Sequence, residues 1–450
     1  MSTAPISTTT TPGGAALPSF GEAFKVWFKI GCLSFGGPAG QIALMHRVLV
    51  DEKKWIDEAR FLHALNYCML LPGPEAQQLA TYVGWLMHGV RGGLAAGLLF
   101  VLPGALVMLG LSFIYVLATG VPIVDGALFG IKAAVLVIVV EAIVRIGRRA
   151  LKSSLLVGIA AAAFVGIFVF QVPFPLIVIG AALIGFAVAR TAPQQLGIKL
   201  ADGTPPPARP DRWRVAGQAT AIWFAIWWAP VVLAVLLLGP GHVLVSLGIF
   251  FSKLAVVSFG GAYALMAYMA QEVVEAQGWL KLPEMVDGLG LAETTPGPLI
   301  LVTQFVGLLA AHREAAPFTP LVAATLGAAM TTWVVFAPSF LWIFAGAPFI
   351  EDVRNNKRLA GALAAITAAV VGVILNLAVW FTLHVLFRTI AEAHAGPIRW
   401  FAIEWASLDI KAAALAAIAA ALVFAFHRGL IETVAIMAAL GIAVRLTLGA

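Results

Sequence analysis

Two sequence motifs occur twice in this chain, and the second copy of each lies 224 residues after the first (253 − 29 and 296 − 72). The stretch Lys29–Gly37 returns as Lys253–Gly261, and Pro72-Gly73-Pro74 returns as Pro296-Gly297-Pro298. Both motifs place glycine or proline, which interrupt helices, inside strongly apolar segments. Duplicated halves with broken helices at matching positions are typical of membrane transporters whose binding site lies between the repeats.

The composition excludes a soluble protein. The chain is 61% hydrophobic and 11% charged, and its mean hydropathy is +0.97, whereas roughly a quarter of the residues of a globular protein are charged. Apolar runs of about 20 residues recur along the whole length, which predicts an all-α polytopic membrane protein in contact with the lipid bilayer. The net charge of +6 does not indicate nucleic acid, because the basic residues gather in short loops between apolar runs.

The apolar runs predict about 13 transmembrane segments in two inverted homologous repeats with broken helices. The segments are expected near 22–50, 59–90, 93–119, 127–149, 153–170, 174–190, 215–238, 241–274, 283–311, 318–346, 357–387, 408–427 and 429–448. This pattern divides the chain into a disordered cytoplasmic tail (1–20), a first repeat (21–190), a polar linker with a connecting helix (191–240) and a second repeat (241–450).

The distribution of basic residues predicts the orientation. Basic loops occur at 145–152, in the linker and at 354–358, and placing them in the cytoplasm also places the N-terminus there. The single crossing near 215–238 separates two sets of six segments, so the second set is inverted relative to the first. Inverted repeats place the substrate site near the middle of the bilayer.

The Gly-Gly motif predicts a backbone anion site. Gly36-Gly37 and Gly260-Gly261 interrupt their apolar segments, and a helix that restarts after a break directs unsatisfied N–H groups along its axis. Ser34 and Ser258 precede each glycine pair by two residues and add hydroxyl groups. The alternative is that these small residues serve close helix packing in the membrane.

The Pro-Gly-Pro motif predicts a second pair of breaks, because two prolines around a glycine do not fit inside a regular helix. Glu75 follows the first copy, where its carboxylate either caps the restarting helix or carries a proton. Thr294 and Thr295 precede the second copy. A plain proline kink is the alternative interpretation.

Lys29 and Lys253 are charges that the two halves share, each seven residues before its glycine pair. Lys253 lies about a dozen residues into an apolar run, and a charge at the bilayer centre costs at least ~2.5–3.5 kcal/mol, which favours a functional role. We expect both ammonium groups to balance the charge of a bound anion.

Signatures of enzymes and of nucleotide or metal binding are missing from the sequence. There is no HExxH or Walker A motif, and Cys32 and Cys68 have no CxxC spacing. We therefore expect a transporter that is not an enzyme and has no cofactor. A membrane-embedded enzyme is a remote alternative, and the sequence leaves a homo-oligomer open.

The motifs resemble those of the chromate ion transporter family, in its long form with two fused homologous halves. The resemblance is carried by Phe35–Gln41, Ala64–Ala80, Phe259–Ala264 and Gly288–Pro298. It implies a multi-pass protein of the inner membrane that exports chromate and confers chromate resistance. The residues themselves indicate an anion transporter and leave sulfate or another oxyanion open.

The inverted arrangement makes a topological prediction. Cysteines introduced beside Ala39 and Ala262, in a background without Cys32 and Cys68, should lie on opposite sides of the membrane. An impermeant thiol reagent applied to one side should then label only one of the two. Equal labelling of both positions from the same side would contradict inverted repeats.

Overall fold

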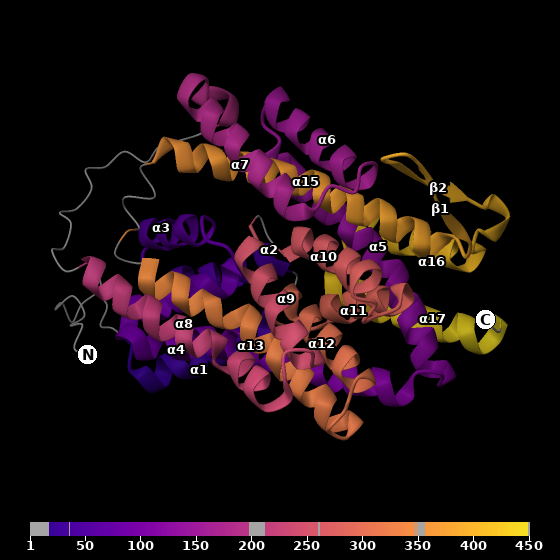
Figure 1. Ribbon diagram of the computed structural model, residues 1–450, viewed down its shortest axis with the longest axis horizontal. Coiled ribbons are helices and arrows are strands. Elements are labelled where there is room, and N and C mark those ends of the chain that lie inside the picture. The colour runs from indigo at the N-terminus through magenta and orange to yellow at the C-terminus, as the bar shows by residue number, and fades with distance from the viewer. Residues whose placement is uncertain are drawn as a thin grey trace. The chain divides into compact units, whose positions relative to one another are not determined.

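The computed structural model describes residues 18–35, 37–197, 212–259, 262–346, 349 and 356–448. Gly36, Gly260 and Gly261 lie outside the described residues, as do residues 1–17 of the predicted tail and 198–211 of the predicted linker. Within the described chain, helices account for almost all regular structure (Figure 1).

The first half contains α1 (Phe20–Leu33), α2 (Gly37–His46), α3 (Glu58–Cys68), α4 (Glu75–Ala118), α5 (Pro122–Ala150), α6 (Ser154–Phe168) and α7 (Phe174–Thr191). The connecting helix is α8 (Arg212–Leu238). The second half contains α9 (Val243–Val257), α10 (Ala262–Gln271), α11 (Leu282–Thr294), α12 (Val302–Arg313), α13 (Pro320–Gly346), α15 (Lys357–Leu386), β1 (Ile390–Ala395), β2 (Ile398–Ile403), α16 (Ile410–Ala420) and α17 (Leu430–Leu448). Short π-helical turns follow α2 (Arg47–Glu52), α10 (Glu272–Ala276) and α16 (Ala421–Ala425), and single 3₁₀ turns lie at Pro193–Leu196, Leu299–Leu301 and Trp405–Ser407.

The helices confirm an all-α polytopic membrane protein. Among the described residues, 7 helices are long and apolar enough to cross a membrane, and four shorter apolar helices accompany them. Two of these four, Val243–Val257 and Leu299–Arg313, arise at the predicted breaks: segment 241–274 divides into α9 and α10, and segment 283–311 into α11 and α12. Glycine and proline end these helices before they reach the length of a full crossing.

The chain forms two compact units, and each takes segments from both halves. The first unit comprises Met1–Ser112, Gly203–Ala262 and Thr295–Arg354, and the second comprises Phe113–Asp202, Tyr263–Thr294 and Asn355–Ala450. The two Pro-Gly-Pro motifs therefore belong to the same unit, although they come from different halves.

In the first unit, α13 packs against α8, α9 and α12 (Figure 1). The helices α12 and α13 cross at glycines, since a Cβ on Gly307 would lie 2.6 Å from the Gly327 carbonyl oxygen. The first half repeats this arrangement inside α4, which bends at His88 and Gly89. There a Cβ on Gly84 would lie 2.5 Å from the Gly92 carbonyl oxygen. Small residues thus let the helix after each Pro-Gly-Pro motif pack closely on the next one.

In the second unit, the last two helices of each half pack against a long helix of the other half. The helices α6 and α7 of the first half pack along α15 of the second (Figure 1), and α16 and α17 of the second half pack along α5 of the first. Glycines bring these backbones together: a Cβ on Gly130 of α5 would overlap the carbonyl of Met437 in α17. The halves are therefore interlocked within this unit.

A β-hairpin interrupts the second half between α15 and α16. Its strands pair antiparallel, with Ile390 opposite Ile403 and Ala395 opposite Ile398. Arg399, which is 4% exposed, anchors one face of the hairpin: its guanidinium pairs with Glu392 (2.8 Å) and donates to the Phe168 carbonyl at the end of α6 (3.1 Å). A cation at a helix C-terminus is favourable because the carbonyl groups there carry partial negative charge.

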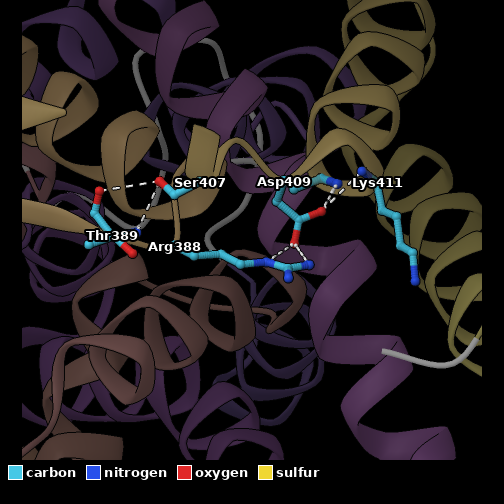
Figure 2. Close-up of polar contacts among 6 residues, drawn as sticks. Arg388, Thr389, Ser407, Asp409 and Lys411 are labelled. Atoms are coloured by element: carbon cyan, nitrogen blue, oxygen red, sulfur yellow. Dashed lines mark hydrogen bonds and ion pairs between the residues drawn. The ribbon is translucent and has the colours of Figure 1, made fainter. Parts of the chain in front are cut away.

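The base of the hairpin is closed by polar contacts (Figure 2). Arg388 donates to Asp409 Oδ2 (2.9 Å), whose other oxygen accepts from the N–H groups of Lys411 and Ala412 at the start of α16 (3.0 Å each). These hydrogen bonds and the Arg388 guanidinium hold the Asp409 carboxylate in place, where it caps α16.

The interlocking of the second unit can be tested at Gly130. Gly130→Ala should lower the melting temperature of the purified protein, because the new methyl group forces α5 and α17 apart. Gly158→Ala adds the same methyl group on α6, where nothing lies within 4 Å, and should leave the melting temperature unchanged or slightly higher. Tryptophan fluorescence in detergent measures both, and equal melting temperatures would contradict the close α5–α17 contact.

Candidate functional site

Each Gly-Gly motif begins with a serine in a tight turn. Ser34 ends α1 with φ −81° and ψ 74°, and Ser258 ends α9 with φ −80° and ψ 68°. The N–H of Phe35 donates to the Leu33 carbonyl (3.0 Å) and the N–H of Phe259 to the Val257 carbonyl (2.9 Å). These are the dihedral angles and the hydrogen bond of an inverse γ-turn. The two halves thus leave their first helix by the same turn.

The serine hydroxyl groups do not point away from their helices. Ser34 Oγ donates to the Ile30 carbonyl (2.6 Å), and Ser258 Oγ donates to the Ala255 carbonyl (3.0 Å). Both side chains are buried. What each serine presents to the rest of the unit is its main-chain carbonyl.

Those carbonyl groups hold the Pro-Gly-Pro turns of the opposite half. The Gly73 N–H donates to the Ser258 carbonyl (2.9 Å), and the Gly297 N–H donates to the Ser34 carbonyl (2.7 Å). The φ angles of Gly73 (117°) and Gly297 (89°) are positive, a conformation that side chains other than glycine rarely adopt. All four residues belong to the first unit, so the breaks predicted from the two halves meet in one place.

Glutamine side chains add hydrogen bonds to the two Pro-Gly-Pro turns. We call these the crossed turns, because each is held by the serine turn of the opposite half. Gln41, one turn into α2, donates from Nε2 to the Gly297 carbonyl (2.6 Å), and Gln78 of α4 donates to the Pro72 carbonyl (2.7 Å). Both side chains are buried, and their Oε1 atoms have no hydrogen-bond partner among the described residues. Ser339 of α13 is also buried with an unpaired hydroxyl, 3.6 Å from where a Cβ on Gly73 would lie. The turns therefore lie in a polar environment inside an apolar bundle.

The predicted lysines lie on the exposed faces of their helices. Lys29 is exposed between the buried Trp27 and Ile30, and Lys253 is exposed between the buried Ser252 and Leu254. Neither lysine has an ion-pair partner among the described residues. The described contacts therefore do not fix either ammonium group beside the breaks.

The remaining predicted residues flank the turns. Glu75 is half-buried at the first position of α4, where a carboxylate is favourable because of the helix dipole. Thr294 ends α11 and its hydroxyl donates to the Leu291 carbonyl (2.7 Å), while Thr295 is buried with its hydroxyl 3.7 Å from Met108 Sδ. Of the four glycines predicted to expose backbone N–H groups, the structure describes Gly37, which begins α2 with φ 69°.

The sequence motifs did not identify Gly104, whose missing side chain leaves room for the turn at Pro296-Gly297-Pro298. A Cβ on Gly104 of α4 would collide with the carbonyl of Pro296, and the Gly104 Cα would lie 3.5 Å from a Cβ on Gly297. Gly104 follows Pro103 inside an apolar run, and nothing local marks it as a contact for a motif almost 200 residues later.

The helical fold and the paired broken helices define a polytopic membrane protein with two repeats, the architecture of many secondary transporters. The chain belongs to the chromate transporter family, since the family model for chromate transporters matches residues 21–186 and 245–444. The matched regions correspond to the two halves.

Curated relatives agree with the family. The chain is 34% identical to the "Chromate transport protein" of Pseudomonas aeruginosa over 79% of each chain. It is 27% identical to the protein of the same name from Cupriavidus metallidurans, over 77% of this chain and 79% of the relative. A "Probable chromate transport protein" of Synechococcus elongatus is 26% identical over 79% of this chain and 83% of the relative. No solved structure matches the chain.

Two substitutions on one helix test whether the crossed turns matter for transport. Gly104→Ala should reduce chromate flux in proteoliposomes by about tenfold or more, because the methyl group displaces the Pro296 carbonyl and the turn that follows it. Gly110→Ala, six residues further along α4 with nothing within 4 Å, should transport like the unmodified protein. Equal flux for the two variants, at equal amounts of folded protein, would show that the turn geometry is unimportant.

Proposed function

We propose that this protein exports chromate from the cytoplasm across the inner membrane, driven by the membrane potential or the proton-motive force, and thereby confers chromate resistance. Membership of the chromate transporter family supports the substrate. The direction rests on the charge of chromate, a tetrahedral oxyanion that is largely a dianion above neutral pH. The N-terminus lies in the cytoplasm in this proposal, as the basic loops indicate.

The observation that carries the proposal is the exchange of backbone hydrogen bonds between the two Pro-Gly-Pro turns and the two serine turns. Beside these turns begin α2 and α4, whose first N–H groups have no partner within their own helix. Such N–H groups, together with the positive end of the helix dipole, favour an oxyanion. A dianion that passes the turns therefore meets oriented N–H groups in place of water.

Main-chain groups, rather than the serine hydroxyls, hold the anion in this proposal. The hydroxyls of Ser34 and Ser258 are engaged within their helices. The N–H groups of the glycine pairs 36–37 and 260–261 are the primary donors, as the motif predicts. The exposed Lys29 and Lys253 attract the anion and balance part of its charge as it enters or leaves.

The membrane potential supplies enough energy for export. Moving one charge across 100 mV is worth ~2.3 kcal/mol, so a dianion that leaves a negative interior gains ~4.6 kcal/mol. At ~1.36 kcal/mol per factor of ten, this sustains an outward gradient of more than a thousandfold. Export then requires neither ATP nor a coupled ion.

Voltage dependence is the direct test of this mechanism. In proteoliposomes whose potential is set by potassium and valinomycin, chromate flux should follow the imposed potential, and radioactive sulfate measured in parallel should move more slowly. Faster movement of sulfate would assign the protein to the alternative substrate. If flux follows a pH gradient and not the voltage, proton coupling replaces the uniport mechanism, and Glu75 becomes the first residue to test.

A further inference from the structure

An ion pair in the second unit, whose carboxylate is buried, has no part in the proposed site at the turns. Lys132 Nζ of α5 lies 2.9 Å from Asp287 Oδ1 of α11. The Tyr115 hydroxyl donates to the other carboxylate oxygen of Asp287 (3.0 Å). The two helices pack closely beside this pair, since a Cβ on Gly290 would lie 2.8 Å from the Ile131 side chain.

Lys132 lies deep within a membrane-spanning helix. It stands ten residues after the start of α5, or ~15 Å along the helix axis, and buried Ile131, Ala133 and Ala134 flank it. Ionisable residues at such a depth are rare because of the cost of inserting charge, and they usually mark substrate or proton pathways. An ion pair also costs desolvation that apolar residues would avoid.

The two side chains of the pair differ in how much of each is exposed. The Lys132 side chain is 24% exposed, whereas the Asp287 side chain is 8% exposed. Asp287 is held on both oxygens, and Glu284, one turn earlier on α11, accepts a hydrogen bond from the Lys281 N–H (2.7 Å). The ammonium group is therefore the more exposed member of the pair.

The pair occurs once although the helix that carries Lys132 occurs twice. Gly126-Ala127-Leu128 of α5 returns as Gly361-Ala362-Leu363 of α15, 235 residues later (361 − 126). In this register Thr367 takes the place of Lys132, and in the register of the motifs His63 takes the place of Asp287. The repeat thus provides one intramembrane ammonium group at this depth rather than two.

We infer that the Lys132–Asp287 pair is a second anion subsite, in which the transported oxyanion takes the place of Asp287 on Lys132. The inference rests on the proposed transport function and adds a residue that binds substrate to it. The oxyanion then pairs with the Lys132 ammonium group in a site of low dielectric constant, while the displaced Asp287 carboxylate stays in the site without its counter-ion. Tyr115 remains a hydrogen-bond donor to the displaced carboxylate.

A purely structural ion pair makes a different prediction from a substrate site. If the pair only joins α5 to α11, the positive charge can stand on either helix. If the oxyanion binds Lys132, the charge must stand on α5 at the more exposed position. Exchanging the two residues separates these alternatives.

The experiment compares four variants in proteoliposomes, with chromate as the probe and the melting temperature as the measure of folding. Lys132→Gln should raise KM by about tenfold to a hundredfold, as expected for the loss of a charge-assisted hydrogen bond, whereas Lys132→Arg should retain most of the affinity. The exchange Lys132→Asp with Asp287→Lys should restore the melting temperature but not the KM. Arg145→Gln, which breaks the more exposed Glu141–Arg145 pair (3.6 Å) on the same helix, is the matched control and should change neither quantity.

Two results would overturn the inference. One is an unchanged KM in a folded Lys132→Gln protein, and the other is an exchanged pair that restores transport together with stability. An unmodified protein that transports no oxyanion would instead overturn the proposed function, and with it this inference.

Discussion

The structure depends on the need to satisfy backbone polar groups where helices break inside a membrane. Lipid offers no hydrogen bonds, so an irregular segment at that depth must find partners within the protein. Here each half supplies them to the other: the Ser258 carbonyl accepts from Gly73, and the Ser34 carbonyl accepts from Gly297. Neither Pro-Gly-Pro turn is complete without the serine turn of the opposite half. The hydrogen bonds that complete each turn therefore come from the other half.

The same dependence recurs in the second unit. The long helix α15 packs between α6 and α7 of the first half, and α5 packs against α16 and α17 of the second. Glycines at the crossings allow this interlocking, as at Gly130 against Met437. Each of the long helices α5 and α15 is therefore covered by the last two helices of the opposite half.

The sequence predicted where the helices break, but it did not predict which distant residues form hydrogen bonds with the turns at those breaks. Glycine and proline act locally, so the duplicated motifs predicted where α1, α9 and α11 end. The partners of the turns lie 185 and 263 residues away (258 − 73 and 297 − 34), and no local pattern encodes that pairing. For the same reason Gly104 and the Lys132–Asp287 pair were not identified, since each gains its meaning from a distant contact. Lys29 and Lys253 occupy matched positions in the repeat and both lie on exposed helix faces, and their role in anion binding stays a prediction.

The most direct test is to locate the bound anion. Crystals of the protein soaked in chromate and measured at the chromium absorption edge give an anomalous signal from the chromium atom alone. The crossed-turn site predicts a peak within about 5 Å of the main-chain nitrogen atoms that begin α2, α4 or α10, since an N–H···O bond of about 2.9 Å places the chromium behind the accepting oxygen. A chromium peak on the protein with none at the broken helices would contradict the assignment of the transport site to these turns.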